Sequence, residues 1–233
     1  MTLRPLSLTH LVQEPAQPSV GKPPLLLLLH GVGSNEQDLF ALASYADLRF
    51  FVISARAPVV LGPGAYGWYP VQWTEGGPHH DPAEAQAGRE AAAAFIKEAV
   101  DAYGLDADQV YLAGFSQGAI TSLSIALLSP QSIAGAVIMS GRLLPEVLPL
   151  VAAPDKLRGL PLLVVHGTRD AVLPIADGRE INQALSPLPV DLTYKEYDMA
   201  HQVSAESLGD VSAWLSHQLD SASPPRRRAK TML

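Results

Sequence analysis

Ser116 lies between two glycines in the stretch VYLAGFSQGAI, residues 110–120. The pattern Gly-x-Ser-x-Gly between a strand and a helix is typical of a nucleophile elbow, a sharp turn that lifts a serine hydroxyl clear of a sheet. Such a turn leaves no room for side chains at Gly114 and Gly118, and it strains the backbone of the serine. The following helix would direct its positive N-terminus at the site. We therefore interpret Ser116 as a nucleophile and not as an ordinary turn residue.

A serine hydroxyl is a weak nucleophile unless a base removes its proton and a third group orients that base. After a nucleophile elbow, the chain order is Asp or Glu and then His. Asp170 follows the apolar run PLLVVHG, and His201 lies in the last loop before a closing helix pattern. The order predicts a catalytic triad of Ser116, Asp170 and His201. Asp177 is a weaker candidate for the acid because it falls inside a predicted helix.

An oxyanion needs hydrogen-bond donors that are placed in advance. The natural donors are the backbone N–H of Gln117 and that of Val32, in the loop HGVGSNEQDL. This loop also partly matches the dinucleotide fingerprint G-x-G-x-x-G, but its third position is Glu36, whose carboxylate would repel a pyrophosphate. We expect no cofactor. His79 and His80 adjoin Asp81 without further ligands in pattern, so we expect no metal.

Two apolar loops are candidates for contact with an acyl chain. One contains Tyr66 and Trp68, and the other begins with Leu143 and Leu144. Each loop would follow the carboxyl end of a strand, where ligands gather in open parallel sheets. The alternative is that these side chains only pack in the core.

These residues need elements that bring them together, and strands alternate with helices along the chain. The predicted strands are 25–30, 50–55, 110–115, 134–140, 161–167 and 191–198, and the predicted helices are 38–46, 82–103, 117–129, 173–186 and 205–219, with a long loop over 56–80. The alternation predicts a single α/β domain over residues 1–220, with a mainly parallel sheet covered by helices on both faces. Residues 221–233 are expected to form a disordered basic tail.

Charge and composition exclude several classes of protein. The net charge is −7, and residues 1–220 carry 12 basic and 23 acidic residues, a net −11, which argues against nucleic acid as a partner. There is no cysteine, hence no disulfide. The longest leucine run, residues 25–29, is too short to cross a bilayer, and residues 1–18 lack the features of a signal peptide. We expect a cytoplasmic protein without stable membrane insertion.

The motifs LHGVGSNEQDL, GFSQG, HGTRDAVLP and a late MAH, in this order, resemble the phospholipase/carboxylesterase family of α/β-hydrolases, which includes bacterial carboxylesterases and acyl-protein thioesterases. The resemblance runs from about Leu25 to Leu219. It implies the α/β-hydrolase fold, the same triad and oxyanion donors, and a position for Trp68 beside the active site.

The chain departs from the family pattern at Ser34 and Pro70, where the family often has Asp, and at Ala119, where it often has Gly. None of these positions removes a catalytic group. We expect a carboxylesterase that acts on a small-molecule acyl ester. The alternatives are an acyl-protein thioesterase or lysophospholipase with the same triad, a non-catalytic binding protein and a dehydrogenase. Homodimerisation stays open.

Overall fold

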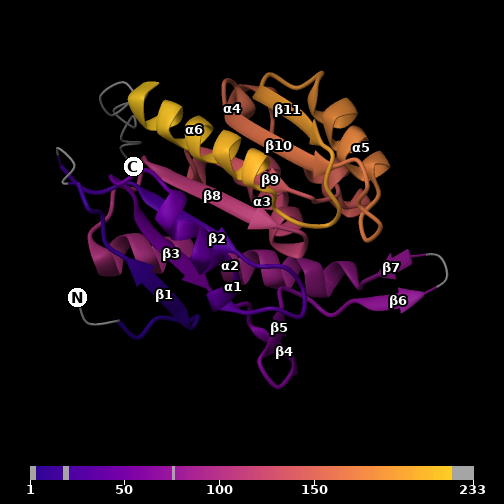
Figure 1. The fold of residues 1–233 in the computed structure, drawn as a ribbon, viewed down its shortest axis with the longest axis horizontal. Helices are drawn as coiled ribbons and strands as arrows, with labels where there is room; N and C mark the ends of the chain where they lie inside the picture. Colours follow the sequence, from indigo (N-terminus) through magenta and orange to yellow (C-terminus); the bar gives the residue numbers. More distant parts are fainter. Residues whose placement is uncertain (1–3, 18–20, 75–76, 222–233) are drawn as a thin grey trace, which may run out of the picture.

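The computed structural model describes residues 4–17, 21–74 and 77–221, and its centre is a seven-stranded sheet of order β1-β3-β2-β8-β9-β10-β11 (Figure 1). All neighbouring strands pair in parallel except β1, which pairs antiparallel with β3 at one edge. The strands of this sheet are β1 (His10–Gln13), β2 (Leu25–Leu29), β3 (Phe51–Ala55), β8 (Val110–Phe115), β9 (Gly135–Met139), β10 (Pro161–Gly167) and β11 (Asp191–Tyr197). The prediction of an α/β fold with a mainly parallel sheet is confirmed.

Helices cover both faces of the sheet (Figure 1). The α-helices are α1 (Glu36–Phe40), α2 (Pro82–Tyr103), α3 (Gln117–Leu128), α4 (Pro154–Leu157), α5 (Ile175–Leu185) and α6 (Ala205–Ser221), and the 3₁₀ helices are η1 (Ala41–Tyr45), η2 (Pro130–Ser132) and η3 (Pro145–Leu150). Buried side chains of α2, α3 and α5 pack on one face, while those of α1, η1 and α6 pack on the other.

The leucine run in β2 shows why the strands read as continuous apolar segments. Leu25, Leu27 and Leu29 join the core on one face, and Leu26 and Leu28 join the core on the other. Successive side chains of a strand point to opposite faces, so a strand covered on both sides must be apolar at every position.

Helix α2 begins and ends where the sequence predicts. Asp81 caps it by accepting a hydrogen bond of 2.8 Å from the Ala83 amide, and Pro82 occupies the first turn. The helix ends at Gly104, which adopts a left-handed conformation with φ of 67° that a side chain would disfavour.

The segment between β3 and α2 differs from the expected loop because it contains two short hairpins. These pair β4 (Val59–Gly62) with β5 (Ala65–Gly67) and β6 (Gln72–Thr74) with β7 (Gly77–His79). Strands of three or four residues among glycines and prolines are too short to show a hydrophobic period. Edge strand β1 was not predicted either, because its four residues are also too few to show a hydrophobic period.

Two further expectations concern the chain outside the sheet. The predicted basic tail covers residues 221–233. Ser221 is the last residue of helix α6, and residues 222–233 lie outside the described residues. Among the residues that are described, no helix combines the length and apolar character needed to cross a membrane.

We predict that Leu27→Ala destabilises the protein by about 2–5 kcal/mol, because Leu27 is fully buried in the middle of the sheet and its truncation leaves a cavity. Urea unfolding followed by circular dichroism measures the change. The matched control is Leu61→Ala in an exposed part of β4, which should change the free energy of unfolding by less than about 0.5 kcal/mol. Equal losses in the two variants would contradict this description of the core.

Candidate active site

Ser116 sits at the turn between β8 and α3, with φ of 54° and ψ of −118°. The turn is so tight that backbone atoms occupy the places where side chains would begin. A Cβ atom on Gly114 would lie 2.2 Å from the Gly118 carbonyl oxygen, and one on Gly118 would lie 1.9 Å from the Leu29 carbonyl oxygen. Both distances are far below van der Waals contact, so both positions require glycine.

Three side chains from distant parts of the chain meet at this turn. The Ser116 Oγ lies 3.0 Å from the His201 Nε2, and the His201 Nδ1 lies 2.7 Å from the Asp170 Oδ2. Ser116 follows β8, Asp170 follows β10 and His201 follows β11, so all three lie at the carboxyl edge of the sheet. The arrangement is that of a serine nucleophile, a base and an acid that orients the base.

Asp170 is held as a carboxylate by its surroundings. Burial raises its pKa, but hydrogen bonds from His201 and from the Leu173 and Val172 amides outweigh burial, and the net pKa is lowered. Both amides donate to Oδ1 at 2.9 Å. An ionised carboxylate only accepts hydrogen bonds, so the proton between the two side chains belongs to the His201 Nδ1. The Nε2 is then free to accept the proton of Ser116.

A second histidine, His166, lies close to Asp170. The Nε2 of His166 donates to the Leu173 carbonyl at 2.8 Å and lies 3.7 Å from the Asp170 Oδ2. Helix α5 approaches this ring at Gly178, where a Cβ atom would lie 2.7 Å from the imidazole. His166 therefore anchors the loop that carries Asp170.

The loop after β2 is held by backbone hydrogen bonds to Tyr66 in strand β5. The Gly33 amide donates to the Tyr66 carbonyl and the Tyr66 amide donates to the Ser34 carbonyl, both at 2.8 Å. Within the described part of the chain, the amides of Val32 and Gln117 donate to no backbone carbonyl. Both residues line the same pocket as Ser116, so two unpaired N–H groups are available near its hydroxyl.

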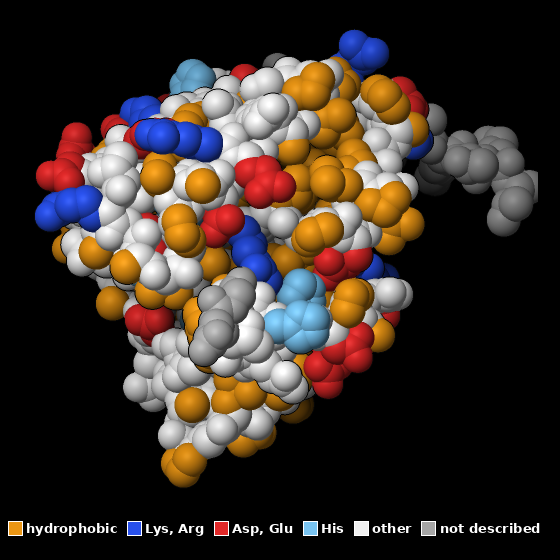
Figure 2. Space-filling model, turned by 90° about the vertical axis from the view of Figure 1, so that its right-hand side faces the viewer, with side chains coloured by type: hydrophobic (Ala, Val, Ile, Leu, Met, Phe, Trp, Pro, Cys, Tyr) orange, Lys and Arg blue, Asp and Glu red, His pale blue; other side chains and the backbone are white. Residues whose placement is uncertain are grey.

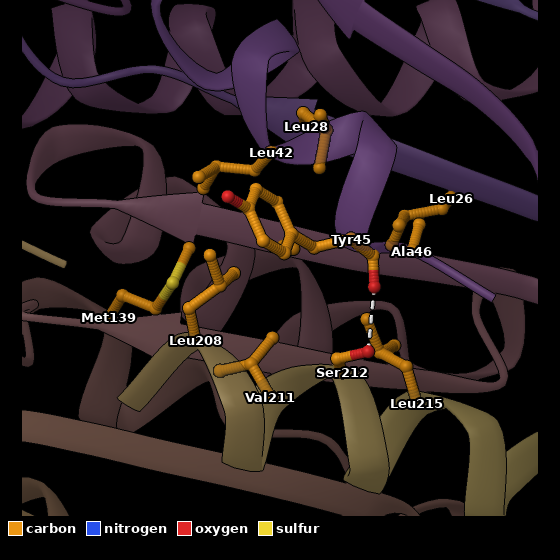
Figure 3. A pocket seen from close by; sticks show the side chains of 11 residues that line it. Leu26, Leu28, Leu42, Tyr45, Ala46, Met139, Leu208, Val211, Ser212 and Leu215 are labelled. Carbon is orange, nitrogen blue, oxygen red and sulfur yellow. Dashed lines mark hydrogen bonds between the residues drawn. The ribbon is translucent and has the colours of Figure 1, made fainter. Parts of the chain in front are cut away.

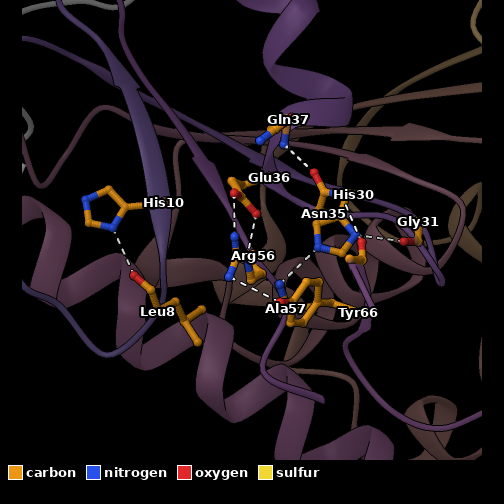
Figure 4. Close-up of polar contacts among 11 residues, drawn as sticks. Leu8, His10, His30, Gly31, Asn35, Glu36, Gln37, Arg56, Ala57 and Tyr66 are labelled. Carbon is orange, nitrogen blue, oxygen red and sulfur yellow. Dashed lines mark hydrogen bonds and ion pairs between the residues drawn. The ribbon is translucent and has the colours of Figure 1, made fainter. Parts of the chain in front are cut away.

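His30 fixes the beginning of this loop (Figure 4). Its Nε2 accepts a hydrogen bond of 3.0 Å from the Ala57 amide, so its Nδ1 carries the proton and donates to the Gly31 carbonyl at 2.7 Å. Burial lowers the pKa of His30, which keeps the ring neutral at neutral pH. His30 is thus an anchor of this loop.

An ion pair supports the loop further along (Figure 4). Arg56 donates from Nε and Nη2 to the carboxylate of Glu36 at 2.6 and 2.7 Å, and its guanidinium lies 4.6 Å from the centre of the Tyr66 ring. The hydrogen bond from Arg56 is the main cause of the lowered pKa of Glu36. The Glu36 carboxylate, which would repel a pyrophosphate, thus ties helix α1 to Arg56.

The side chain of Gln117 joins the nucleophile elbow to the loop between β5 and β6. Its Oε1 accepts from the Trp68 amide at 2.8 Å, and its Nε2 donates to the Tyr69 carbonyl at 2.7 Å. The Trp68 indole donates to the His30 carbonyl at 3.0 Å. Trp68 is fully buried, so it positions the site and offers no surface to a ligand.

A mostly apolar pocket opens beside Ser116. Its lining residues come from the loops after β2, β5, β9 and β10, from the elbow and helix α3, and from the β6–β7 hairpin: Val32, Tyr69, Val71, Trp73, Pro78, Ser116, Gln117, Ile120, Arg142, Val172 and Leu173. Apolar linings with a few polar groups suit small organic ligands.

The four side chains expected to contact substrate lie elsewhere. Leu143 and Leu144 are buried in the core, Trp68 hydrogen-bonds the backbone of β2's end, and Tyr66 packs against Arg56. None of these four side chains lines the pocket, and their contact with a substrate stays a prediction. Sequence analysis did not single out Arg142, although it lies three residues beyond β9, at the carboxyl edge of the sheet where ligands gather.

A second pocket, of about 350 Å³, lies between η1 and α6 on the other face of the sheet (Figure 3). Its lining is almost wholly apolar, and its Ser212 hydroxyl is already bonded to the Tyr45 carbonyl at 2.6 Å. It contains none of the triad. Within the described ranges no group of histidine and acidic residues could hold a metal ion, and His80 instead contacts Glu146 and Arg142.

Comparison with known proteins agrees with this geometry. The family model for Phospholipase/Carboxylesterase matches residues 10–219. The chain is 28% identical over 224 residues to acyl-protein thioesterase 1 of Kluyveromyces lactis, covering 89% of this chain and 96% of that protein. It is similar to the crystal structure of the Bacillus cereus carboxylesterase, with a TM-score of 0.76, 25% identity and 91% and 95% of the two chains covered. The fold also matches esterase PE8, with a TM-score of 0.79, 24% identity and 91% and 99% covered. The chain therefore belongs to the phospholipase/carboxylesterase family of α/β-hydrolases.

Proposed function

We propose that the protein is a serine carboxylesterase that hydrolyses small acyl esters through Ser116, His201 and Asp170. The observation that carries the proposal is the continuous hydrogen-bonded chain from Asp170 through His201 to Ser116, which ends beside a mostly apolar pocket. A serine in this setting can be deprotonated as it attacks, which its hydroxyl cannot do unaided.

In the first half-reaction, the Ser116 Oγ attacks the ester carbonyl carbon while its proton passes to the His201 Nε2. Asp170 keeps the Nδ1 protonated and stabilises the imidazolium that forms. The carbonyl oxygen becomes an oxyanion, which the amides of Val32 and Gln117 bind. The imidazolium then protonates the leaving alkoxide, the C–O bond breaks, and Ser116 holds the acyl group.

In the second half-reaction, His201 removes a proton from water, and the resulting hydroxide attacks the acyl carbon. The same two amides bind the second oxyanion. The Ser116 oxygen leaves with the proton from His201, and the free acid departs. No other reactant is needed, because the protons taken up in each half-reaction are returned in it.

A thioester or lysophospholipid substrate would use the same steps. The K. lactis relative is named a thioesterase, and nothing in the triad distinguishes sulfur from oxygen in the leaving group. A non-catalytic role would not require the Ser116–His201–Asp170 chain that the protein has. A cytoplasmic location stays a prediction, and homodimerisation stays open.

The first test is Ser116→Ala, which removes the attacking oxygen. We expect kcat for 4-nitrophenyl butyrate to fall by at least about 10³-fold and fluorophosphonate labelling to disappear. The control is Ser122→Ala on helix α3, whose buried hydroxyl has no hydrogen-bond partner among the described residues, and it should keep both properties. A folded Ser116→Ala protein with near wild-type turnover would refute the proposal.

Asp170→Asn tests the role of the acid. The amide can donate a hydrogen bond to His201 and stabilise the wrong tautomer, so kcat should fall by roughly 10⁴-fold while the melting temperature changes little. Asp177→Asn, the rival acid on α5, should retain most of the activity. If Asp177→Asn were the more damaging of the two, the assignment of the acid would be wrong.

Arg56→Gln tests the support of the oxyanion loop. It leaves the nearly buried Glu36 carboxylate without its ion pair, so the loop that carries Val32 loosens. We expect kcat to fall by about tenfold and KM to change less, because the oxyanion forms only in the transition state. Arg49→Gln, which breaks the ion pair with Asp47 instead, should leave kcat unchanged. Equal effects of the two variants on kcat would contradict this role.

A further inference from the structure

Arg142 is a charged side chain in an otherwise uncharged pocket. It follows β9, which pairs in parallel with β8, so it emerges at the same edge of the sheet as Ser116. It lines the pocket beside Ser116, and no other described residue of the lining is charged. Figure 2 looks onto this side of the molecule and shows a Lys or Arg side chain in a hollow, next to histidine side chains.

The guanidinium is held in position without being neutralised. Its Nη1 donates to the Pro78 carbonyl at 3.3 Å, and its Nη2 donates to the His80 Nδ1 at 3.2 Å. The His80 Nε2 lies 2.6 Å from the Glu146 carboxylate, to which it donates. The described carboxylates therefore reach Arg142 only through His80 or at longer range, as Asp177 does, and form no direct ion pair with it.

One donor of this guanidinium is left over. The Nε of Arg142 is buried and has no hydrogen-bond partner among the described residues. Buried donors are almost always paired, so an unpaired one needs an explanation such as a missing ligand. Arginine is the side chain best suited to bind a carboxylate, because its planar donors match the two oxygens.

A wholly neutral ester forms no ion pair with the Arg142 guanidinium. An acyl chain that enters the pocket removes water from the guanidinium, and burying a charge without a partner is costly. An ester that carries a carboxylate replaces that water with a charge-assisted hydrogen bond. The electrostatics of the pocket thus favour an anionic substrate over an uncharged one of the same shape.

We propose that Arg142 binds a carboxylate of the substrate, and that the preferred substrates are esters with a negative charge on the acyl or the alcohol part. This inference rests on the proposed esterase activity and narrows its substrate class. The competing interpretation is that Arg142 only ties the β6–β7 hairpin to the loop after β9.

The first measurement uses the wild-type protein and matched pairs of esters. One pair is the 4-nitrophenyl monoester of adipic acid and the same compound with its free acid methylated, which places the charge on the acyl part. The other pair is the butyrate ester of 3-hydroxybenzoic acid and that of its methyl ester, which places the charge on the alcohol part. We expect kcat/KM to be about 10- to 100-fold higher for the charged member of at least one pair, as a charge-assisted hydrogen bond allows. No preference for the charged member in either pair would overturn the proposal.

The second measurement uses variants of Arg142 on the pair that shows the preference. Arg142→Gln should abolish the preference, because it should raise KM for the charged ester far more than KM for the neutral ester. Arg142→Lys should keep part of the preference, because the charge remains but the planar fork is lost. The control Arg179→Gln removes an exposed positive charge that pairs with Glu196 and should change neither ester. Equal losses on both esters in Arg142→Gln would show a structural role only.

These outcomes separate the two proposals. If neutral esters are hydrolysed with full dependence on Ser116 but no charged ester is preferred, the assignment of Arg142 fails and the esterase stands. If no ester of either kind is hydrolysed and Ser116 is not labelled by a fluorophosphonate, the proposed activity itself fails.

Discussion

The strained backbone of Ser116 is the constraint on which the rest of the site depends. A residue with a side chain and a φ of 54° costs of order 1–3 kcal/mol, and it persists only when its surroundings fix it. Here the Ser116 amide donates to Met139 at 2.9 Å and its carbonyl accepts from Ile120 at 3.0 Å, so neighbouring β9 and helix α3 both hold the turn. The two flanking glycines allow β8, β2 and α3 to approach closely enough to impose it.

Around this fixed point, each of the proposed catalytic groups is held by a partner that takes no part in the proposed chemistry. His166 and two amides hold Asp170, the Arg56–Glu36 pair and His30 hold the loop of Val32, and the Gln117 side chain holds the pocket wall. The longest of these contacts, between Gln117 and Trp68, joins residues 49 positions apart in the sequence. A rigid sheet with every parallel strand ending at one edge makes such convergence possible, because loops that follow neighbouring strands start only one strand spacing apart.

Local patterns were sufficient to predict most of the elements and to propose Ser116, Asp170 and His201 as the reacting groups. Strands β8 and β10 are found where continuous apolar runs lie between turn signals, and Ser116, Asp170 and His201 follow strands in the expected order. The pocket wall could not be predicted in this way, because the direction taken by Trp68 depends on hydrogen bonds to Gln117 and His30, which are distant in sequence. Strand β1 depends likewise on pairing with β3, to which its four residues give little local indication.

The attachment of the elbow to the β5–β6 loop through Gln117 uses only backbone atoms of that loop. The Gln117 side chain makes hydrogen bonds to the backbone of Trp68 and Tyr69, in the loop between β5 and β6. These bonds do not depend on which side chains follow in the sequence. Val71, Trp73 and Pro78 lie beyond that point and shape the mouth of the pocket. Substitutions at these three positions would therefore change the shape of the pocket mouth while the hydrogen bonds from Gln117 to the backbone remain.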